Sequence, residues 1–242
     1  MEFDLFNWDS SYVGSVWPLT TGIGGFLIFW ILSHEKKLED LFFSRYGAEQ
    51  GSVYHFIFSK GLGVIFLAVI PIILCTTFAG FNPWDVMGTN GKILFIVLST
   101  LVLGAIAIPL IASSAKKPET LEKYPQIRQK QWSGKTVLIN ITGWSAYLFG
   151  YELLFRGLLL FPLVDRFGVW PAIAINTTLY STTHIAKGLN EAVAAIPTGI
   201  LLCVLTLMTG NIWIAFLVHL IIALTNSFAA LIYNKAFTIK WR

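Results

Sequence analysis

The chain has 242 residues, of which 55% are hydrophobic and only 12% are charged, and its mean hydropathy is +0.69. Because a soluble domain carries about 25% charged residues, this composition excludes a soluble globular protein, and it equally excludes a disordered chain, a collagen-like fibre and a disulfide-stapled secreted domain. The net charge of +4 does not indicate nucleic acid as a partner, since no segment mixes dense Lys and Arg with exposed aromatic residues, so membrane lipid is the expected partner.

Seven apolar windows follow one another along the chain, each long enough to cross a bilayer. The hydrocarbon core of about 30 Å takes about 20 helical residues, and unbroken apolar runs of this length exclude the alternating pattern of a barrel. The sequence therefore predicts an all-α, polytopic transmembrane helix bundle of about seven spans. The windows lie near residues 15–33, 61–81, 92–114, 136–164, 169–187, 190–209 and 211–233.

Positive charge is distributed unevenly among the connecting segments. The loops from Lys36 to Lys60 and from 115 to 135, the position Lys187 and the tail after residue 233 together hold 14 of the 17 Lys and Arg residues. Cytoplasmic loops of membrane proteins carry an excess of such residues. We therefore expect these segments in the cytoplasm, with the amino terminus outside and the carboxyl terminus inside.

One acidic residue, Glu152, falls well inside a predicted span, and Arg156 follows it four residues later. This spacing brings two side chains together on one face of a helix. A charge at the bilayer centre costs about 2.5 to 3.5 kcal/mol on insertion scales, so an acid kept there is a candidate functional residue with a partner. The alternative is a Glu–Arg pair that only fastens its helix into the bundle.

Two histidines also lie in predicted spans. His184 extends a polar stripe formed with Asn176 and Tyr180, while His219 has Asn226 seven residues further along on its own face. Counting the helical rise from the segment ends shows that both can meet Glu152 in one cavity. A carboxylate beside an imidazole can take a proton from water, while a second imidazole donates to the attacked carbonyl. Single interhelical hydrogen bonds are the structural alternative.

The same three residues are candidate zinc ligands, since one Glu and two His side chains can hold Zn²⁺ with an open fourth position. The signature is weak, because the ligands come singly from three segments and no H-E-x-x-H pair occurs. Metal dependence is left open.

Three motifs, in order over roughly residues 136 to 230, resemble those of the CPBP family, the CAAX-processing and bacteriocin-processing intramembrane proteases that are also called Abi proteins. A subgroup of this family is more similar still, because it has an aromatic residue before the motif glutamate and a Lys and a Glu after the motif histidine. The segments are Glu152-Leu-Leu-Phe-Arg156-Gly157, Tyr180-Ser-Thr-Thr-His184 continuing to Lys187 and Glu191, and Thr209-Gly210-Asn211-Ile212-Trp213 followed by His219.

The resemblance implies a multi-pass endopeptidase of a bacterial cytoplasmic membrane, which hydrolyses a peptide or a lipidated protein near the cytoplasmic side. It implies a division into amino-terminal helices and loops (1–135), a catalytic core (136–233) and a cytoplasmic tail (234–242). The residues that match the family motifs as catalytic are Glu152, His184 and His219, and the supporting ones are Arg156, Tyr180, Lys187, Glu191 and Asn226.

Two positions depart from the family pattern. Tyr151 replaces the first glutamate of the usual pair, and Ala223 stands where the family has Asn or Asp, although Asn226 can cover the same face. Either Glu152 or Glu191 then supplies the carboxylate, or the chain is a catalytically impaired member that acts as an immunity, scaffold or regulatory membrane protein. A transporter is a third alternative, against which stands the lack of an inverted repeat.

Overall fold

The computed structural model describes residues 13–240; residues 1–12, and residues 241–242 of the predicted tail, lie outside the described part. Nearly all of the described chain is helical, which confirms the predicted all-α bundle. The helices are α1 (Val13–His34), α2 (Lys36–Val64), η2 (Ile65–Val69), α3 (Ile70–Ala79), η3 (Pro83–Val86), α4 (Ile93–Ser114), α5 (Pro118–Lys123), α6 (Gly134–Glu152), η4 (Leu153–Leu159), α7 (Leu160–Phe167), α8 (Val169–Thr183), η5 (Ile185–Lys187), α9 (Leu189–Thr209) and α10 (Trp213–Tyr233).

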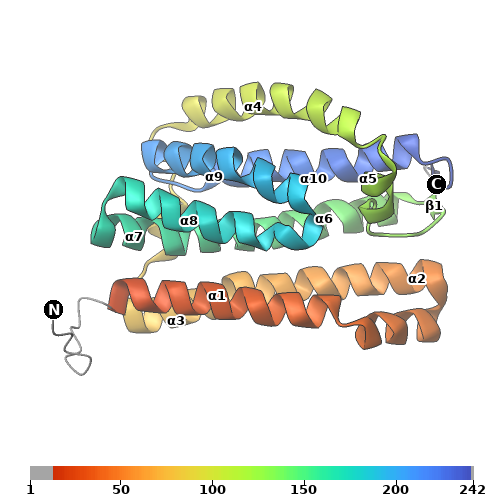
Figure 1. Ribbon diagram of the computed structural model, residues 1–242, viewed down its shortest axis with the longest axis horizontal. Helices are drawn as coiled ribbons and strands as arrows, with labels where there is room; N and C mark the ends of the chain where they lie inside the picture. The colour runs from red at the N-terminus through yellow and green to blue at the C-terminus, as the bar shows by residue number, and fades with distance from the viewer. Residues whose placement is uncertain (1–12, 241–242) are drawn as a thin grey trace.

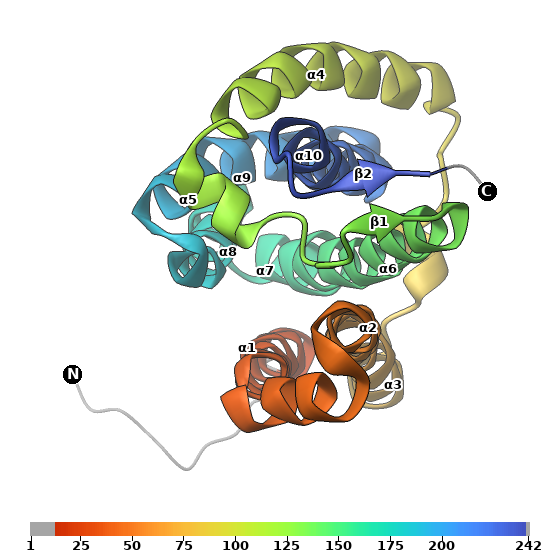
Figure 2. The same ribbon diagram turned by 90° about the vertical axis from the view of Figure 1, so that its right-hand side faces the viewer.

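The helices form three groups (Figures 1 and 2). Helices α1, α2 and α3 pack together on one side, α6 to α10 form the centre, and α4 lies outside against α10. The segment from Gly134 to Phe167 runs through the middle of the molecule and is buried along 78% of its most apolar window. Helices α2 and α6 are in contact, so the site below lies between the first group and the centre.

Six helical segments of the described chain are long and apolar enough to cross a membrane, which makes this an integral multi-pass protein. The seventh segment, α8, has 15 residues and is about 22 Å long at 1.5 Å per residue. The prediction that this span continues to Lys187 is wrong. His184 ends α8, and the chain leaves through η5 to Gly188, whose φ of 113° no helix accommodates.

Helix α2 corrects a second expectation, that residues up to Lys60 form a loop before a span at 61–81. The chain instead turns back at Gly47, where φ is 74° and a residue without a Cβ is favoured, and a second helical arm continues through Lys60 toward α3 (Figure 1). Lys60 is therefore a buried helical residue. The polar residues before position 61 lower the hydropathy of this second helical arm. A hydropathy window therefore does not detect it, because the window does not take account of charges that aromatic neighbours bury.

A two-stranded parallel sheet closes one end of the bundle (Figure 2). Strand β1 (Gln131–Trp132) precedes α6, and β2 (Thr238–Ile239) follows α10. Two hydrogen bonds of 2.8 Å join them, from the amide of Thr238 to the carbonyl of Lys130 and from that of Lys240 to Trp132. The tail is thereby tied to the start of the central helix.

Candidate active site

The segment that carries the first motif is not a regular α-helix. Residues Leu153–Leu159 form a π-helical stretch between α6 and α7, in which the carbonyl of Phe155 accepts from the amide of Leu160. The side-chain amide of Asn176 on α8 donates to the same carbonyl at 2.6 Å. Such π-helical turns occur frequently at functional sites. Here the turn lies directly after Glu152 and includes Arg156.

The Glu152 carboxylate holds two partners in the interior. Its Oε2 lies 3.1 Å from Nη1 of Arg156, as the spacing of four predicts, and its Oε1 lies 2.6 Å from Nδ1 of His219 on α10. The Arg156 contact is an ion pair whose angles do not meet those of a hydrogen bond, and the guanidinium also lies 4.3 Å from the ring centroid of Tyr180. Glu152 and Arg156 are both fully buried.

The two histidines lie beside each other at the inner end of a pocket. Their ring centroids are 6.3 Å apart with the rings inclined by 29°. His184 donates from Nδ1 to the backbone carbonyl of Tyr180 at 2.9 Å, because a carbonyl can only accept. Each ring thus uses Nδ1 within the protein, which leaves Nε2 as the nitrogen available to the pocket. The structure brings His184, directly after α8, and His219 of α10 to this pocket, and His219 in turn contacts Glu152 of α6.

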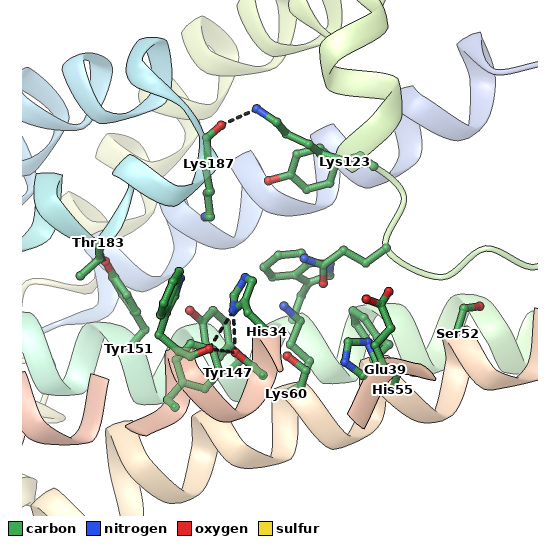
Figure 3. Close-up of a pocket in the computed structure, with 18 of the residues that line it drawn as sticks. His34, Glu39, Ser52, His55, Lys60, Lys123, Tyr147, Tyr151, Thr183 and Lys187 are labelled. Atoms are coloured by element: carbon green, nitrogen blue, oxygen red, sulfur yellow. Dashed lines mark hydrogen bonds between the residues drawn. The ribbon is translucent and has the colours of Figure 1, made fainter. Parts of the chain in front are cut away.

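The pocket has a volume of about 410 Å³ and lies between α1 and α2 on one side and α6, η5 and α10 on the other. Figure 3 shows Tyr151 and Thr183 at one end and Glu39, Ser52 and His55 at the other. Aromatic side chains make up much of the wall between these ends. The aromatic residues are Phe26, Phe29, Trp30, Phe43, Phe56, Tyr124, Trp144, Tyr147 and Tyr151.

Glu152 does not itself line this pocket but lies behind His219. The sequence suggested a carboxylate in direct contact with water, whereas the structure gives Glu152 contact with a histidine instead. Tyr151 does line the pocket, and its hydroxyl lies 2.6 Å from Thr183 Oγ1. Since Thr183 donates to a backbone carbonyl, Tyr151 is the donor to Thr183. Among the described residues that line the pocket, the one carboxylate is Glu39.

The supporting residues divide into those near the pocket and those away from it. Lys187 lines the pocket, and desolvation there lowers the pKa of its ammonium group while Glu191 opposes the shift. Glu191 and Asn226 do not line it. Glu191 shares no helical face with His184 and Lys187, because no helix runs through residue 188. Glu191 lies instead 3.9 Å from Nζ of Lys123.

The residues do not fit a zinc ion held by Glu152, His184 and His219. Both Glu152 oxygens face partners within the protein, and His219 directs Nδ1 to that carboxylate. Over residues 13–240, no three His, Cys, Asp or Glu side chains are placed to hold a metal ion. We therefore derive no step through a metal.

Sequence reasoning did not identify several lining residues, and it considered Tyr151 only as a departure from the family pattern. Trp144, Tyr147 and Tyr151 recur at intervals of three and four on α6, and that spacing could have identified an aromatic wall. Thr183 and Lys60 gave no such signal, because the first depends on where α8 ends and the second comes from a distant helix.

Residues 133–225 match the family model described as Rce1-like, type II CAAX prenyl endopeptidase. The match covers less than half of the chain but includes Glu152, Arg156, Tyr180, His184 and His219. It confirms the resemblance to CAAX-processing proteases over this segment. No curated protein matches the chain significantly, and no solved structure does.

Proposed function

We propose that the protein is an intramembrane endopeptidase that hydrolyses a peptide bond of a peptide or lipidated protein near the cytoplasmic side of the membrane. One observation carries this proposal: two histidines with engaged Nδ1 atoms present Nε2 to one pocket, and a buried carboxylate supports the second of them. The family match over the same residues supports a protease.

In this mechanism His184 is the general base. Its Nδ1 carries the hydrogen that the Tyr180 carbonyl accepts, so Nε2 of the neutral ring accepts a proton from water. The water oxygen then bonds to the carbonyl carbon of the substrate. The same proton passes to the peptide nitrogen as the C–N bond breaks, which releases an amine and a carboxylic acid.

His219 supplies the matching electrophile. The Glu152 carboxylate at 2.6 Å stabilises a positively charged imidazole ring, which can donate from Nε2 to the oxygen of the attacked carbonyl. Glu152 is then a positioning residue that acts through His219, and Arg156 balances its charge. The sequence also raised the possibility that Glu191 is the base. The position of Glu191, 3.9 Å from Nζ of Lys123, does not support this role.

The proposal is tested with the full chain reconstituted in liposomes and a fluorogenic, prenylated CAAX peptide, which the family description suggests as a substrate. The wild-type protein should cleave it. His184→Ala and His219→Ala should each lower the rate by at least about 10²-fold, the lower end for general acid–base catalysis, with unchanged elution on size exclusion. Equal cleavage by wild type and both variants would assign the activity to a contaminant and contradict the proposal.

A non-catalytic member of the same fold is the second candidate. The observation that favours it is Tyr151, a phenol that donates to Thr183 and stands at the position of the family's first glutamate. If His184→Ala keeps the full effect of the wild-type chain in cells, while neither form cleaves peptide, an immunity, scaffold or regulatory role replaces the protease.

We further propose that the end of the bundle that carries the loop of residues 115–133 and the β1–β2 sheet faces the cytoplasm. Most connecting segments rich in Lys and Arg lie at this end (Figure 1). Topology reporters inserted after Lys130 should respond as cytoplasmic, and one near Asp85 should respond from the opposite side, in a bacterial cytoplasmic membrane. Reporters that respond from one side at both positions would contradict this orientation.

A further inference from the structure

Lys60 on α2 is a buried lysine whose amino group is enclosed by aromatic rings. Its side chain lines the pocket and is 5% exposed, and its Nζ lies 3.4 Å from the ring centroid of Trp144, 4.5 Å from that of Tyr147 and 5.3 Å from that of Phe56. The faces of these rings attract a cation. They cannot, however, accept the three hydrogens of an ammonium group as oxygen atoms do.

No acidic side chain within residues 13–240 pairs with this ammonium. The acidic side chains in ion pairs near the pocket are Glu191, which pairs with Lys123, and Glu152, which pairs with Arg156 and His219. Burying a charge without a counter-charge is unfavourable, and such groups in membrane proteins mark ligand pathways. A protonated Lys60 therefore has no counter-anion within the described chain.

Lys187 approaches the same space from the opposite wall. Figure 3 shows its side chain running from η5 into the pocket, toward the side from which Lys60 comes. Both side chains line this pocket, and two ammonium groups that face one cavity repel each other. An anion between them would relieve this repulsion.

The other basic side chains at the pocket are already engaged. Lys123 donates to the carbonyl of Lys187, and the Arg128 guanidinium donates to carbonyls of residues 121 and 122. Within the described chain, Lys60 and Lys187 have neither a hydrogen bond from Nζ nor an ion pair. They are the pocket lysines that remain available to a ligand.

The amino group of Lys60 lies within reach of the two histidines for one extended peptide. Along α6, the Lys60 ammonium contacts Trp144 and Tyr147, whereas His219 packs against Tyr151 with ring centroids 5.4 Å apart. Four to seven residues of helix rise about 6 to 10 Å. An extended peptide rises about 3.3 Å per residue, so one bound chain can reach both places.

We infer that Lys60, with Lys187 opposite, binds the terminal carboxylate of a peptide whose scissile bond lies at His184 and His219. This inference rests on the proposed function, and it makes Lys60 a specificity-determining residue. The released fragment would carry the carboxylate, while the part of the substrate before the scissile bond lies on the other side of the histidines.

The test uses two peptides identical except that one ends in a free carboxylate and the other in an amide. Cleavage is measured with the reconstituted full chain, and binding is measured separately with the His184→Ala form. Wild type should prefer the free acid by about tenfold to a hundredfold in kcat/KM, as expected for a hydrogen bond to a charged group, with the difference mainly in KM.

Lys60→Met should bring the ratio of acid to amide in kcat/KM close to one. Methionine suits an aromatic cage, and Lys60→Arg, which keeps the charge, should retain part of the preference. Lys135→Met is the matched control, because Lys135 is an exposed lysine at the start of α6 that does not line the pocket, and it should keep the full ratio. If Lys60→Met does not fold, Lys187→Gln should show a smaller loss of the same preference.

The outcomes separate the two proposals. Equal cleavage of acid and amide by wild type, or a full preference retained in Lys60→Met, overturns the role of Lys60 and leaves the protease standing. A binding preference without any cleavage, lost in Lys60→Met, supports the anion site and contradicts the protease. Loss of the preference in vesicles that contain phosphatidylglycerol, but not in neutral ones, would assign Lys60 to a lipid phosphate and overturn the inference.

Discussion

Two apolar segments have opposite surroundings, and the more hydropathic of the two is the more exposed. The segment Ile93–Ser114, which is α4, is buried along only 17% of its most apolar window, whereas Gly134–Phe167 is buried along 78%. Lipid tails are as apolar as Leu, so apolar character does not draw one helix toward another in a membrane. The central segment differs in carrying Glu152 and Arg156, whose charges require protein around them. The higher hydropathy belongs to the exposed helix, and the ionisable side chains belong to the inner one.

The pocket shows a second contrast, between its two walls. The helices of the family-matched segment hold both histidines and the buried acid, while α1 and α2 outside that segment contribute Trp30, Phe56 and Lys60. We interpret the first wall as the source of the chemistry and the second as the source of selectivity. Variants in the first wall should therefore change rate or folding, and variants in the second should change substrate choice.

The largest effect should come from Arg156→Met, because it leaves the Glu152 carboxylate with one partner fewer in the interior. Removing one member of a buried ion pair typically costs about 3 to 5 kcal/mol. We expect a marked loss of monodisperse protein after extraction, measured by size exclusion. Arg45→Met, at an exposed arginine of α2, should leave the yield unchanged. The double variant Arg156→Met with Glu152→Gln should recover part of the yield. A normal yield of Arg156→Met alone would show that the interior tolerates the Glu152 carboxylate without a counter-charge from Arg156.

Glu152→Gln should have the next largest effect, and on rate more than on folding. Glutamine keeps the acceptor oxygen for His219 Nδ1 but removes the negative charge that stabilises the positive ring. We expect cleavage to fall by about 10²-fold. Glu119→Gln, on the exposed face of α5, serves as the control for loss of one carboxylate. A rate for Glu152→Gln equal to that of the control would leave the Glu152–Arg156 pair as a purely structural feature.

Lys123→Met tests the contact between α5 and the turn that carries Lys187. Its Nζ donates to the carbonyl of Lys187 and lies 3.9 Å from Glu191, so its loss frees the turn that carries Lys187. Exposed ion pairs contribute about 0 to 1 kcal/mol, so folding should be unaffected. We expect kcat/KM to fall by about threefold, roughly the effect of one modest hydrogen bond. Lys117→Met, at the start of α5, is the control and should change neither folding nor kcat/KM. An unchanged kcat/KM for Lys123→Met would show that the turn keeps its conformation without the contact to Lys123.

The smallest effect should come from Tyr151→Phe. It removes only the hydroxyl that donates to Thr183, and Thr183 keeps its own bond to the Tyr180 carbonyl. The expected cost is about 1 kcal/mol or less in stability, with cleavage within about threefold of wild type. A large loss of cleavage, measured in the same peptide assay, would give the phenol a direct part in the reaction and would require a different assignment of the proton transfers.

The sequence predicted the bundle and the proximity of Glu152, His184 and His219. Both a charge within an apolar span and the spacing along a helix can be recognised from the sequence alone. It could not predict that Glu152 lies behind His219, since the order of side chains across a cavity depends on how three helices rotate. Nor could it locate Lys60, whose burial depends on rings from α6. The end of α8 was also missed, because Gly188 acts through its backbone and not through hydropathy.

The β1–β2 sheet sets an order of assembly. Lys130 and Thr238, which it joins, are 108 residues apart, and domains generally fold from the amino-terminal end during synthesis. The segment between α5 and β1 contributes Tyr124, Gln126 and Arg128 to the pocket, and β2 can hold its end only after α10 has been made. Both histidines precede β2 in the chain, so the segment that contributes Tyr124, Gln126 and Arg128 is held in place only after the histidines have been made, and the pocket closes as a late step in the maturation of the protein.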